Sequence, residues 1–289
     1  MTFAERLAAD AALCEARLLS VLEGRADQPV TAAMRYALRG GKRLRGFLVL
    51  EGARMLGVCE DRALSAAAAV EALHAYSLVH DDLPCMDDDD LRRGQPTVHR
   101  KWDEATAVLA GDALQTLAFE LLCDPTLGPA EVRVALVSGL AKASGIDGMV
   151  LGQALDIAAE TAGRPLTLEE ITALQAGKTG ALIGFAAKAG AVIAGADPLP
   201  LRHYAAALGL AFQIADDILD VTGDEARTGK RVGKDAGAGK ATFVSLLGLE
   251  GARVRAAALV AEAEAALAGY GNRAANLIAA ARFVIARDK

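Results

Sequence analysis

Apolar and polar positions repeat with a helical period along almost the whole chain, and the strict alternation typical of strands is scarce. Two segments, 63–80 and 201–221, are apolar nearly all round, which predicts two central buried helices. Turn-forming residues separate helices at 124–129 and 197–200. The pattern predicts an all-α helical bundle in a single domain, residues 1–289, with its function lodged between helices. Further helices are predicted at 3–22, at 104–123, from the capping-box sequence Thr167–Glu170 onward, and at 250–286.

Each of the two central helices runs into a cluster of aspartates. The clusters are Asp81, Asp82 and Asp87, continuing through 88–90, and Asp216, Asp217 and Asp220. Residues four apart share a helix face, so Asp216 and Asp220 are expected to point the same way. Pro84 interrupts the first helix and is expected to fold Asp87 back towards Asp81. Each cluster is either a solvated acidic helix end or part of one site for divalent cations.

The ligand chemistry of the two clusters favours the cation site. Carboxylate oxygens without a neighbouring metal-binding His or Cys suit Mg²⁺ or Mn²⁺. Mg²⁺ completes its shell with water and substrate phosphate, so two such clusters predict a clamp on a diphosphate through bridging metal ions. An EF-hand is excluded, because the chain lacks that loop's spacing and its closing Glu.

Basic residues gather beside glycines and beside the first acidic cluster, where they could bind phosphate. The polar segment 222–241 holds five glycines and five basic residues, and a loop of that length is usually functional or disordered. Each of these cations is either an exposed surface charge or part of a set that could hold a second phosphorylated molecule without metal. The basic groups are Lys42 with Arg45 after Gly40–Gly41, Arg92 with Arg93, Lys178 beside Thr179, and Lys230 with Lys240.

Composition narrows the class of protein further. The chain is 53% hydrophobic but 4% aromatic, and its net charge of −6 gives no support to nucleic-acid binding. Its four cysteines lie far apart, which fits a reducing cytoplasm, and Cys85 is expected to pack as a small hydrophobe. The N-terminus does not resemble a signal peptide, and the apolar stretch Ala181–Ala196 is short for a membrane span. We therefore expect a soluble cytoplasmic protein without stable membrane insertion.

Six stretches carry a family resemblance: GGKRLR, HAYSLVHDD, DDLPCMDDDDLRRG, GDALQTLAF, KTGAL and GLAFQIADDILD. Their order and spacing, from about residue 35 to 250, resemble the motifs of trans-isoprenyl diphosphate synthases, closest to the bacterial farnesyl branch. The resemblance implies an all-α homodimer with a deep central cavity, and a prenyltransferase acting on isopentenyl and allylic diphosphates. One departure is Gly46, where relatives often have proline.

The resemblance also implies roles for individual residues. Asp81 and Asp87 would bind two Mg²⁺ ions with Asp82 in support, and Asp216 would bind a third with Asp217 and Asp220 in its shell. Arg92, Lys178, Gln213 and Lys230, with Thr179 beside them, would hold the allylic diphosphate. Lys42, Arg45, His74 and Arg93 would hold isopentenyl diphosphate, and Lys240 would contact diphosphate as its loop closes. His80 is expected to be structural.

The implied reaction is ionisation of the allylic C–O bond, attack by the double bond of isopentenyl diphosphate, and proton loss to the departing diphosphate. Tyr76 and Ser77 lie about one turn before Asp81, where an aromatic side chain would form a floor under the growing prenyl chain. We expect (2E,6E)-farnesyl diphosphate, made from dimethylallyl and geranyl diphosphates; geranylgeranyl diphosphate is the alternative. A terpene cyclase should lack the GGKRLR set, and a non-catalytic partner subunit should have lost acidic residues.

Overall fold

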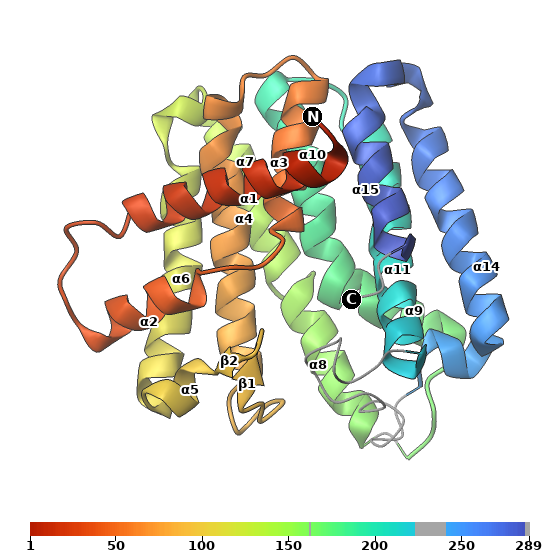
Figure 1. Cartoon of the computed structure of the whole chain (residues 1–289), viewed down its shortest axis with the longest axis horizontal. Coiled ribbons are helices and arrows are strands. Elements are labelled where there is room, and N and C mark those ends of the chain that lie inside the picture. Colours follow the sequence, from red (N-terminus) through yellow and green to blue (C-terminus); the bar gives the residue numbers. More distant parts are fainter. Residues whose placement is uncertain (162, 223–240, 287–289) are drawn as a thin grey trace. The chain divides into compact units, whose positions relative to one another are not determined.

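The computed structural model describes residues 1–161, 163–222 and 241–286. These residues are mostly helical, which confirms the all-α class; their only strands form one antiparallel pair of two residues each (Figure 1). The chain divides into two compact units, Met1–Ser138 with Val192–Ala194 and Gly139–Ala191 with Gly195–Lys289. Each unit is described by itself, and the single-domain organisation stays a prediction.

The elements follow the order expected from the pattern. The first unit contains α1 (Phe3–Ser20), α2 (Pro29–Ala37), α3 (Leu44–Met55), α4 (Glu60–Asp81), β1 (Leu91–Arg92), β2 (Gln95–Pro96), α5 (Val98–Lys101), α6 (Glu104–Leu122) and the 3₁₀ turn η1 (Pro125–Leu127). The second contains α8 (Met149–Glu160), α9 (Leu168–Gln175), the π-helical η2 (Ala176–Gly180), α11 (Leu199–Thr222), α14 (Phe243–Ala266), the 3₁₀ η3 (Ala268–Ala274) and α15 (Ala275–Ala286). Helices α7 (Ala130–Ser144) and α10 (Ala181–Ala194) include residues of both units.

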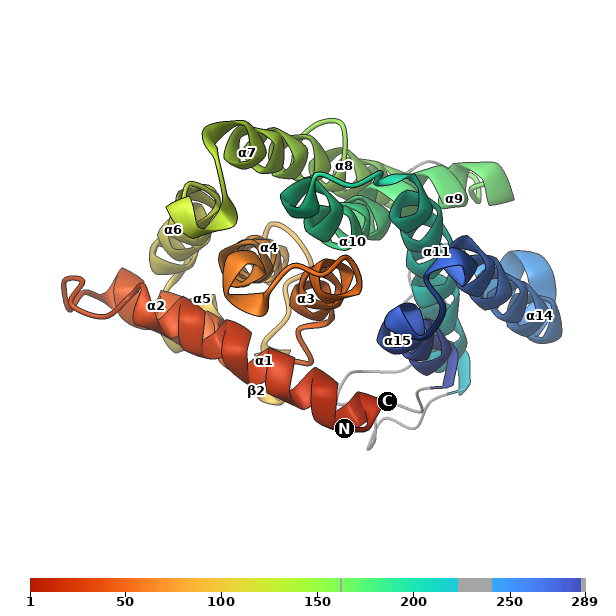
Figure 2. The same ribbon diagram turned by 90° about the horizontal axis from the view of Figure 1, so that it is seen from above.

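Helix α4 forms the centre of the first unit. It packs against α1, α3 and α6, which surround it when the unit is seen from above (Figure 2). The run Ala66–Ala69 is fully buried, and its small side chains let neighbouring helices approach closely. A charged cluster joins α1 to α3: Arg54 pairs with the fully buried Asp10 at 2.7 Å and with Glu51 at 2.5 Å. The predicted central helix is therefore confirmed.

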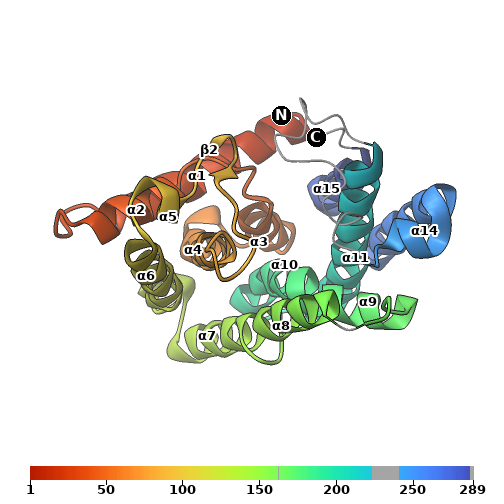
Figure 3. The same cartoon turned by 90° about the horizontal axis from the view of Figure 1, so that it is seen from below.

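Helix α11 is the second predicted central helix, and it holds the second unit together. It packs against α14, α15 and η2, and Figure 3 shows it between α14 and α15. Tyr204 is fully buried, and its hydroxyl donates a 2.7 Å hydrogen bond to the Leu277 carbonyl on α15. This bond satisfies the polar end of an otherwise apolar contact.

Local signals read from the sequence also hold in the structure. Thr167 and Glu170 form the predicted capping box at the start of α9. The turn at 124–129 contains η1, and α10 and α11 are separated at 195–198. Residues 223–240, which include Lys230 and Lys240 of the predicted loop, lie outside the described residues.

Two segments are long and apolar enough to cross a membrane by length and composition alone, α6 and Ala130–Ala159. Half of the apolar window of α6 is buried inside the protein, as in the core helix of a soluble protein. The second segment is not one continuous helix, because α7 ends at Ser144 and α8 begins at Met149. Neither segment is therefore strong evidence for a membrane protein.

Candidate active site

The first acidic cluster lies where α4 ends. The helix stops at Asp81, and the chain turns so that the Asp87 N–H donates a 2.8 Å hydrogen bond to the Asp81 carbonyl. The predicted return of Asp87 towards Asp81 after Pro84 is therefore confirmed at the level of the backbone. Asp87 is exposed and Asp81 is half-buried, so carboxylates leave the helix end in reach of solvent. Cys85 is also exposed, so the prediction that it packs as a buried hydrophobe is wrong.

Asp82 differs from its neighbours because it is buried and paired. Its carboxylate accepts hydrogen bonds from Arg92 Nε at 2.7 and 2.9 Å, and Arg92 Nη2 lies 2.6 Å from it. Burial is the largest influence and acts to lower the pKa of Arg92, but the hydrogen bond to Asp82 and the charges of Asp82, Asp81 and Asp89 together outweigh it and raise the pKa. Asp82 is therefore engaged in fixing Arg92 beside the cluster, and its support of a metal ion stays a prediction.

A short hairpin places the two arginines that follow the cluster. β1 pairs with β2 through the two-residue turn Arg93–Gly94, in which φ is 53° and 73°. Such a turn needs positive φ at both positions, which glycine supplies easily and arginine does not. Arg93 Nη1 donates to the Arg39 and Gly40 carbonyls, at 3.2 Å each. The strained turn thus holds Arg93 against the chain between α2 and α3.

His74 shares this basic neighbourhood on α4. Burial first, and then the nearby charges of Arg45, Arg93, Arg92 and Arg43, lower its pKa well below the ordinary histidine value. The imidazole is therefore neutral at neutral pH and can accept or donate one hydrogen bond. The structure thus brings Arg45, His74 and Arg93, three of the residues predicted to hold isopentenyl diphosphate, into one electrostatic neighbourhood. Lys42 is exposed in the same segment as Arg45.

Residues one turn before the first cluster were predicted to limit product length. The Tyr76 ring contacts the His80 ring edge to face, with centroids 5.1 Å apart. Burial first, and then the charges of Asp81 and Asp112, raise the pKa of Tyr76. The Ser77 hydroxyl donates to the His74 carbonyl at 2.9 Å. The role of Tyr76 and Ser77 in product length stays a prediction.

His80 has a packing role against α6. Its Nε2 lies 3.0 Å from the Val108 carbonyl oxygen. A Cβ on Gly111 would lie only 2.0 Å from the same nitrogen, so α6 needs glycine at this position to admit the ring. The structural role predicted for His80 agrees with these contacts.

The second acidic cluster lies near the end of α11, and its three aspartates differ in their surroundings. Asp217 is 5% exposed, and its carboxylate accepts the Phe243 N–H at 2.7 Å and the Gln213 amide at 3.1 Å. It thereby caps the first turn of α14 and joins that helix to α11. Asp216 and Asp220 are half-buried and four residues apart on one continuous helix, so they share a face, as predicted.

A π-helical turn positions the residues predicted to hold the allylic diphosphate in the second unit. In η2, Lys178 pairs with Asp156 at 2.7 Å, and the Thr179 hydroxyl donates to Gln213 at 3.3 Å. A Cβ on Gly152 would lie 2.0 Å from the backbone nitrogen of Lys178, so α8 can approach η2 this closely only because residue 152 is glycine. Short π-helical turns are frequent at functional sites. Thr179, Gln213 and Asp217 form one connected hydrogen-bonded chain.

The donor set is suited to a hard divalent cation. The predicted ligands Asp81, Asp87, Asp216 and Asp220 all present carboxylate oxygens, the donors that Mg²⁺ prefers. Within the parts of the chain that the structure describes, no three His, Cys, Asp or Glu side chains are grouped closely enough to form a metal site by themselves. Mg²⁺ commonly takes only one or two protein carboxylates and completes its shell with water and phosphate, so these residues fit it.

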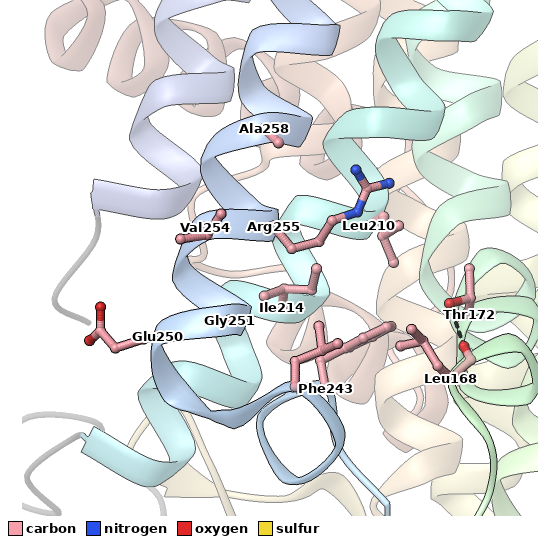
Figure 4. A pocket seen from close by; sticks show the side chains of 11 residues that line it. Leu168, Thr172, Leu210, Ile214, Phe243, Glu250, Gly251, Val254, Arg255 and Ala258 are labelled. Atoms are coloured by element: carbon pink, nitrogen blue, oxygen red, sulfur yellow. Dashed lines mark hydrogen bonds between the residues drawn. The ribbon is translucent and has the colours of Figure 1, made fainter.

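An apolar pocket of about 570 Å³ lies between α9, α11 and α14 (Figure 4). In Figure 4, Phe243, Ile214 and Arg255 lie among the lining residues, whereas the Glu250 side chain points away from them. Among the described residues that line it, none was predicted to bind substrate or metal. The pocket lies beside the Asp217–Phe243 bond rather than at the exposed carboxylates.

Sequence reasoning missed two acids that pair with basic residues of the predicted motifs. The buried Glu71 on α4 faces Arg43, and the half-buried Asp156 on α8 pairs with Lys178. Glu71 did carry a signal, because it is a lone carboxylate in an apolar helix, and such a charge is rarely buried without a partner. Asp156 had no comparable signal.

An all-α chain with two aspartate clusters and a set of basic residues around them defines the class of enzymes that act on prenyl diphosphates. The chain belongs to the polyprenyl synthetase family, which it matches over residues 27–269. It is similar to farnesyl diphosphate synthase of Escherichia coli (strain K12), with 50% identity over 91% of each chain. It is also 45% identical to a chloroplastic geranylgeranyl pyrophosphate synthase of Capsicum annuum, over 89% of this chain and 71% of that one.

A solved structure agrees with these sequence relatives. The crystal structure of an FPP/GFPP synthase from Zymomonas mobilis has a TM-score of 0.90 and 46% identity, covering 98% of both chains. The predicted family and the isoprenoid synthase fold are therefore confirmed.

Proposed function

We propose that this protein is a farnesyl diphosphate synthase that joins isopentenyl diphosphate head-to-tail to dimethylallyl and then geranyl diphosphate. The observation that carries the proposal is the full-length similarity to farnesyl diphosphate synthases, at 50% identity over 91% of each chain. Both aspartate clusters and the basic sets that the reaction needs are present in this chain. The product would be (2E,6E)-farnesyl diphosphate with release of diphosphate.

The metal would be Mg²⁺: Asp81 and Asp87 would bind two ions, and Asp216 would bind a third, with Asp220 in its shell. Bound there, it would neutralise charge on the departing diphosphate. Arg92, fixed by Asp82, is assigned to the allylic diphosphate. Lys178, Thr179 and Gln213 share that assignment, as does Lys230 of the segment outside the described residues.

The second substrate is assigned to Lys42, Arg45, His74 and Arg93, with Lys240 contacting diphosphate. The low pKa of His74 supports this, because a neutral imidazole can donate to a phosphate oxygen without adding another charge to the arginine group. These residues bind and orient isopentenyl diphosphate so that its double bond meets the allylic carbon. The proton released would pass to the departing diphosphate.

Geranylgeranyl diphosphate synthesis is the second candidate, because a relative with that name is 45% identical over 89% of this chain. Tyr76 is the residue that would separate the two products. A large aromatic side chain one turn below Asp81 would stop chain growth at C15. The partly buried position of Tyr76 next to His80 supports this role, because a ring held by a second ring keeps its place.

The protein would act as a homodimer in the cytoplasm. Apolar side chains on the first unit are exposed in the single chain, including Val108 at 40%, Leu109 at 53% and Val134 at 67%. Burying such residues against a second copy would remove them from water. Light scattering after size-exclusion chromatography tests this: twice the monomer mass supports the dimer, and the monomer mass opposes it.

The test of the activity is incubation with isopentenyl and dimethylallyl diphosphates, followed by chromatography of the dephosphorylated products. A C15 product formed with Mg²⁺ and absent in EDTA supports the proposal, and a C20 product favours the second candidate. Asp87→Ala serves as the inactive control. The absence of any metal-dependent prenyl product would oppose both.

A further inference from the structure

The segment that carries Lys42 and Arg45 has an unusual backbone. Gly40 and Gly41 have φ of 72° and 87°, and Arg43 has φ of 48°. Glycine enters this left-handed region without steric penalty, whereas a residue with a Cβ is strained there. Surrounding contacts must therefore hold Arg43 in its conformation.

Arg43 is buried between two carboxylates. Its side chain is 4% exposed; Nη2 donates to Glu15 at 3.1 Å, and Nη1 lies 3.9 Å from a Glu71 oxygen. Nη2 also donates to the Leu38 carbonyl. A guanidinium enclosed in this way cannot also bind a substrate phosphate, which separates Arg43 from its neighbours Lys42 and Arg45.

The two carboxylates also hold both ends of the segment. Glu15 accepts the Gly40 N–H at 3.0 Å, and Glu71 accepts the Gly46 N–H at 2.8 Å. The second bond caps α3, which has no capping hydrogen bond from its own N-cap side chain. Glu15, Arg43 and Glu71 thus clamp residues 40–46 at the start, middle and end; we call them the arginine clamp.

The contacts of Gly46 explain why this chain has glycine where relatives often have proline. Proline at 46 would have no N–H to donate to Glu71. A Cβ there would also lie 2.8 Å from the Cys14 sulfur and 3.2 Å from Glu71 Cγ. The residue after the GGKRLR stretch is therefore adapted to the clamp in this protein.

The clamp connects directly to the other residues assigned to isopentenyl diphosphate. His74 lies three residues after Glu71 on α4, so the two share a helix face. Arg93 stacks over Gly41, where a Cβ would lie 2.8 Å from its Cζ. A shift of residues 40–46 would therefore move Lys42 and Arg45 and remove the backbone surface on which Arg93 packs.

We propose that Glu15, Arg43 and Glu71 are positioning residues that set Lys42 and Arg45 for binding the metal-free diphosphate, an inference that rests on the proposed function. They touch no substrate themselves. Their effect is therefore expected in the binding of isopentenyl diphosphate and not in that of the allylic substrate.

The test measures isopentenyl diphosphate binding by titration calorimetry in EDTA, together with KM for both substrates in Mg²⁺. Glu71→Gln keeps an oxygen for Gly46 and removes the charge facing Arg43. We expect it to raise Kd and KM for isopentenyl diphosphate about tenfold and to leave KM for geranyl diphosphate within about twofold. Arg43→Gln should do the same, and the double variant should be no worse than the poorer single one. Arg43→Lys, a milder change, should weaken binding less.

Asp10→Asn is the matched control, since Asp10 is also a buried carboxylate paired with an arginine, but its arginine partner is Arg54 on α3 and not Arg43. It should lower the melting temperature and leave Kd unchanged. The inference is overturned if Glu71→Gln binds as wild type does, if Asp10→Asn weakens binding equally, or if wild type does not bind in EDTA. Wild-type binding without prenyl product would refute the proposed function alone.

Discussion

Replacing Asp82 by alanine should destabilise the folded protein by about 3 kcal/mol in the absence of any metal ion. The Asp82 side chain is 4% exposed and the Arg92 side chain 19%, and three N–O distances of 2.6–2.9 Å join them. Removing one partner of a buried pair costs about 3–5 kcal/mol, and the residual exposure of Arg92 places this case at the lower end. About 3 kcal/mol corresponds to a change of roughly 150-fold in the unfolding equilibrium.

The assay is urea denaturation in EDTA, followed by circular dichroism, on a double-mutant cycle of Asp82→Ala and Arg92→Ala. The two changes should be strongly coupled, so that the double variant is far more stable than the sum of the single losses predicts. Asp87→Ala is the control: Asp87 is exposed, so its loss should change stability by less than about 0.5 kcal/mol. A coupling free energy below about 0.5 kcal/mol, or an equal loss in Asp87→Ala, would show that Asp82 does not act through Arg92.

Three further outcomes are expected. Because the pKa of His74 is lowered in the folded state, the unfolded chain takes up a proton first as pH falls below about 6.5. The free energy of unfolding should therefore fall below that pH by up to about 1.4 kcal/mol per pH unit more in wild type than in His74→Gln. Parallel pH profiles of the two proteins would contradict this. Tyr76→Ala should lengthen the product beyond C15 while Tyr76→Phe keeps it, as read by chromatography; unchanged products from both would place the floor elsewhere. Thr167→Ala should cost about 1 kcal/mol in urea denaturation by removing the α9 cap, and a loss below about 0.3 kcal/mol would mean that the cap is not needed.

Periodicity and helix-end signals were sufficient to predict the main helices and the return of the chain after Pro84. Helix α4 packs against three helices, so its residues are apolar nearly all round. This pattern can be recognised from the spacing of apolar residues in the local sequence. The capping box at Thr167 was predictable for the same reason, since both its partners lie within four residues.

Contacts made between distant parts of the chain could not be read in this way. Asp217 belongs to an aspartate motif, yet its carboxylate is committed to the Phe243 N–H, 26 residues away. A single lysine such as Lys178 is usually an exposed surface charge, but in the structure the π-helical turn places it in an ion pair with Asp156. Such turns arise from tertiary packing, here the close approach of Gly152, and no local residue preference signals them.

The arginine clamp is a second example of contacts between distant residues that the sequence does not reveal. Lys42 and Arg45 were predicted to bind substrate, and Arg43 between them was given no role, because a sequence carries charge but not burial. Its left-handed backbone and its two carboxylate partners on α1 and α4 separate it from them. Burial thus distinguishes Arg43, which is proposed as a positioning residue, from Lys42 and Arg45, which are predicted to bind substrate.

The most direct measurement is the mass of the prenyl product formed from isopentenyl and dimethylallyl diphosphates, with Mg²⁺ and with EDTA. The expected result is a C15 diphosphate in Mg²⁺, none in EDTA, and none from Asp87→Ala. Product that forms equally in EDTA, or no prenyl product from the wild-type protein in Mg²⁺, would contradict the assignment of the aspartate clusters to a metal-assisted prenyl transfer.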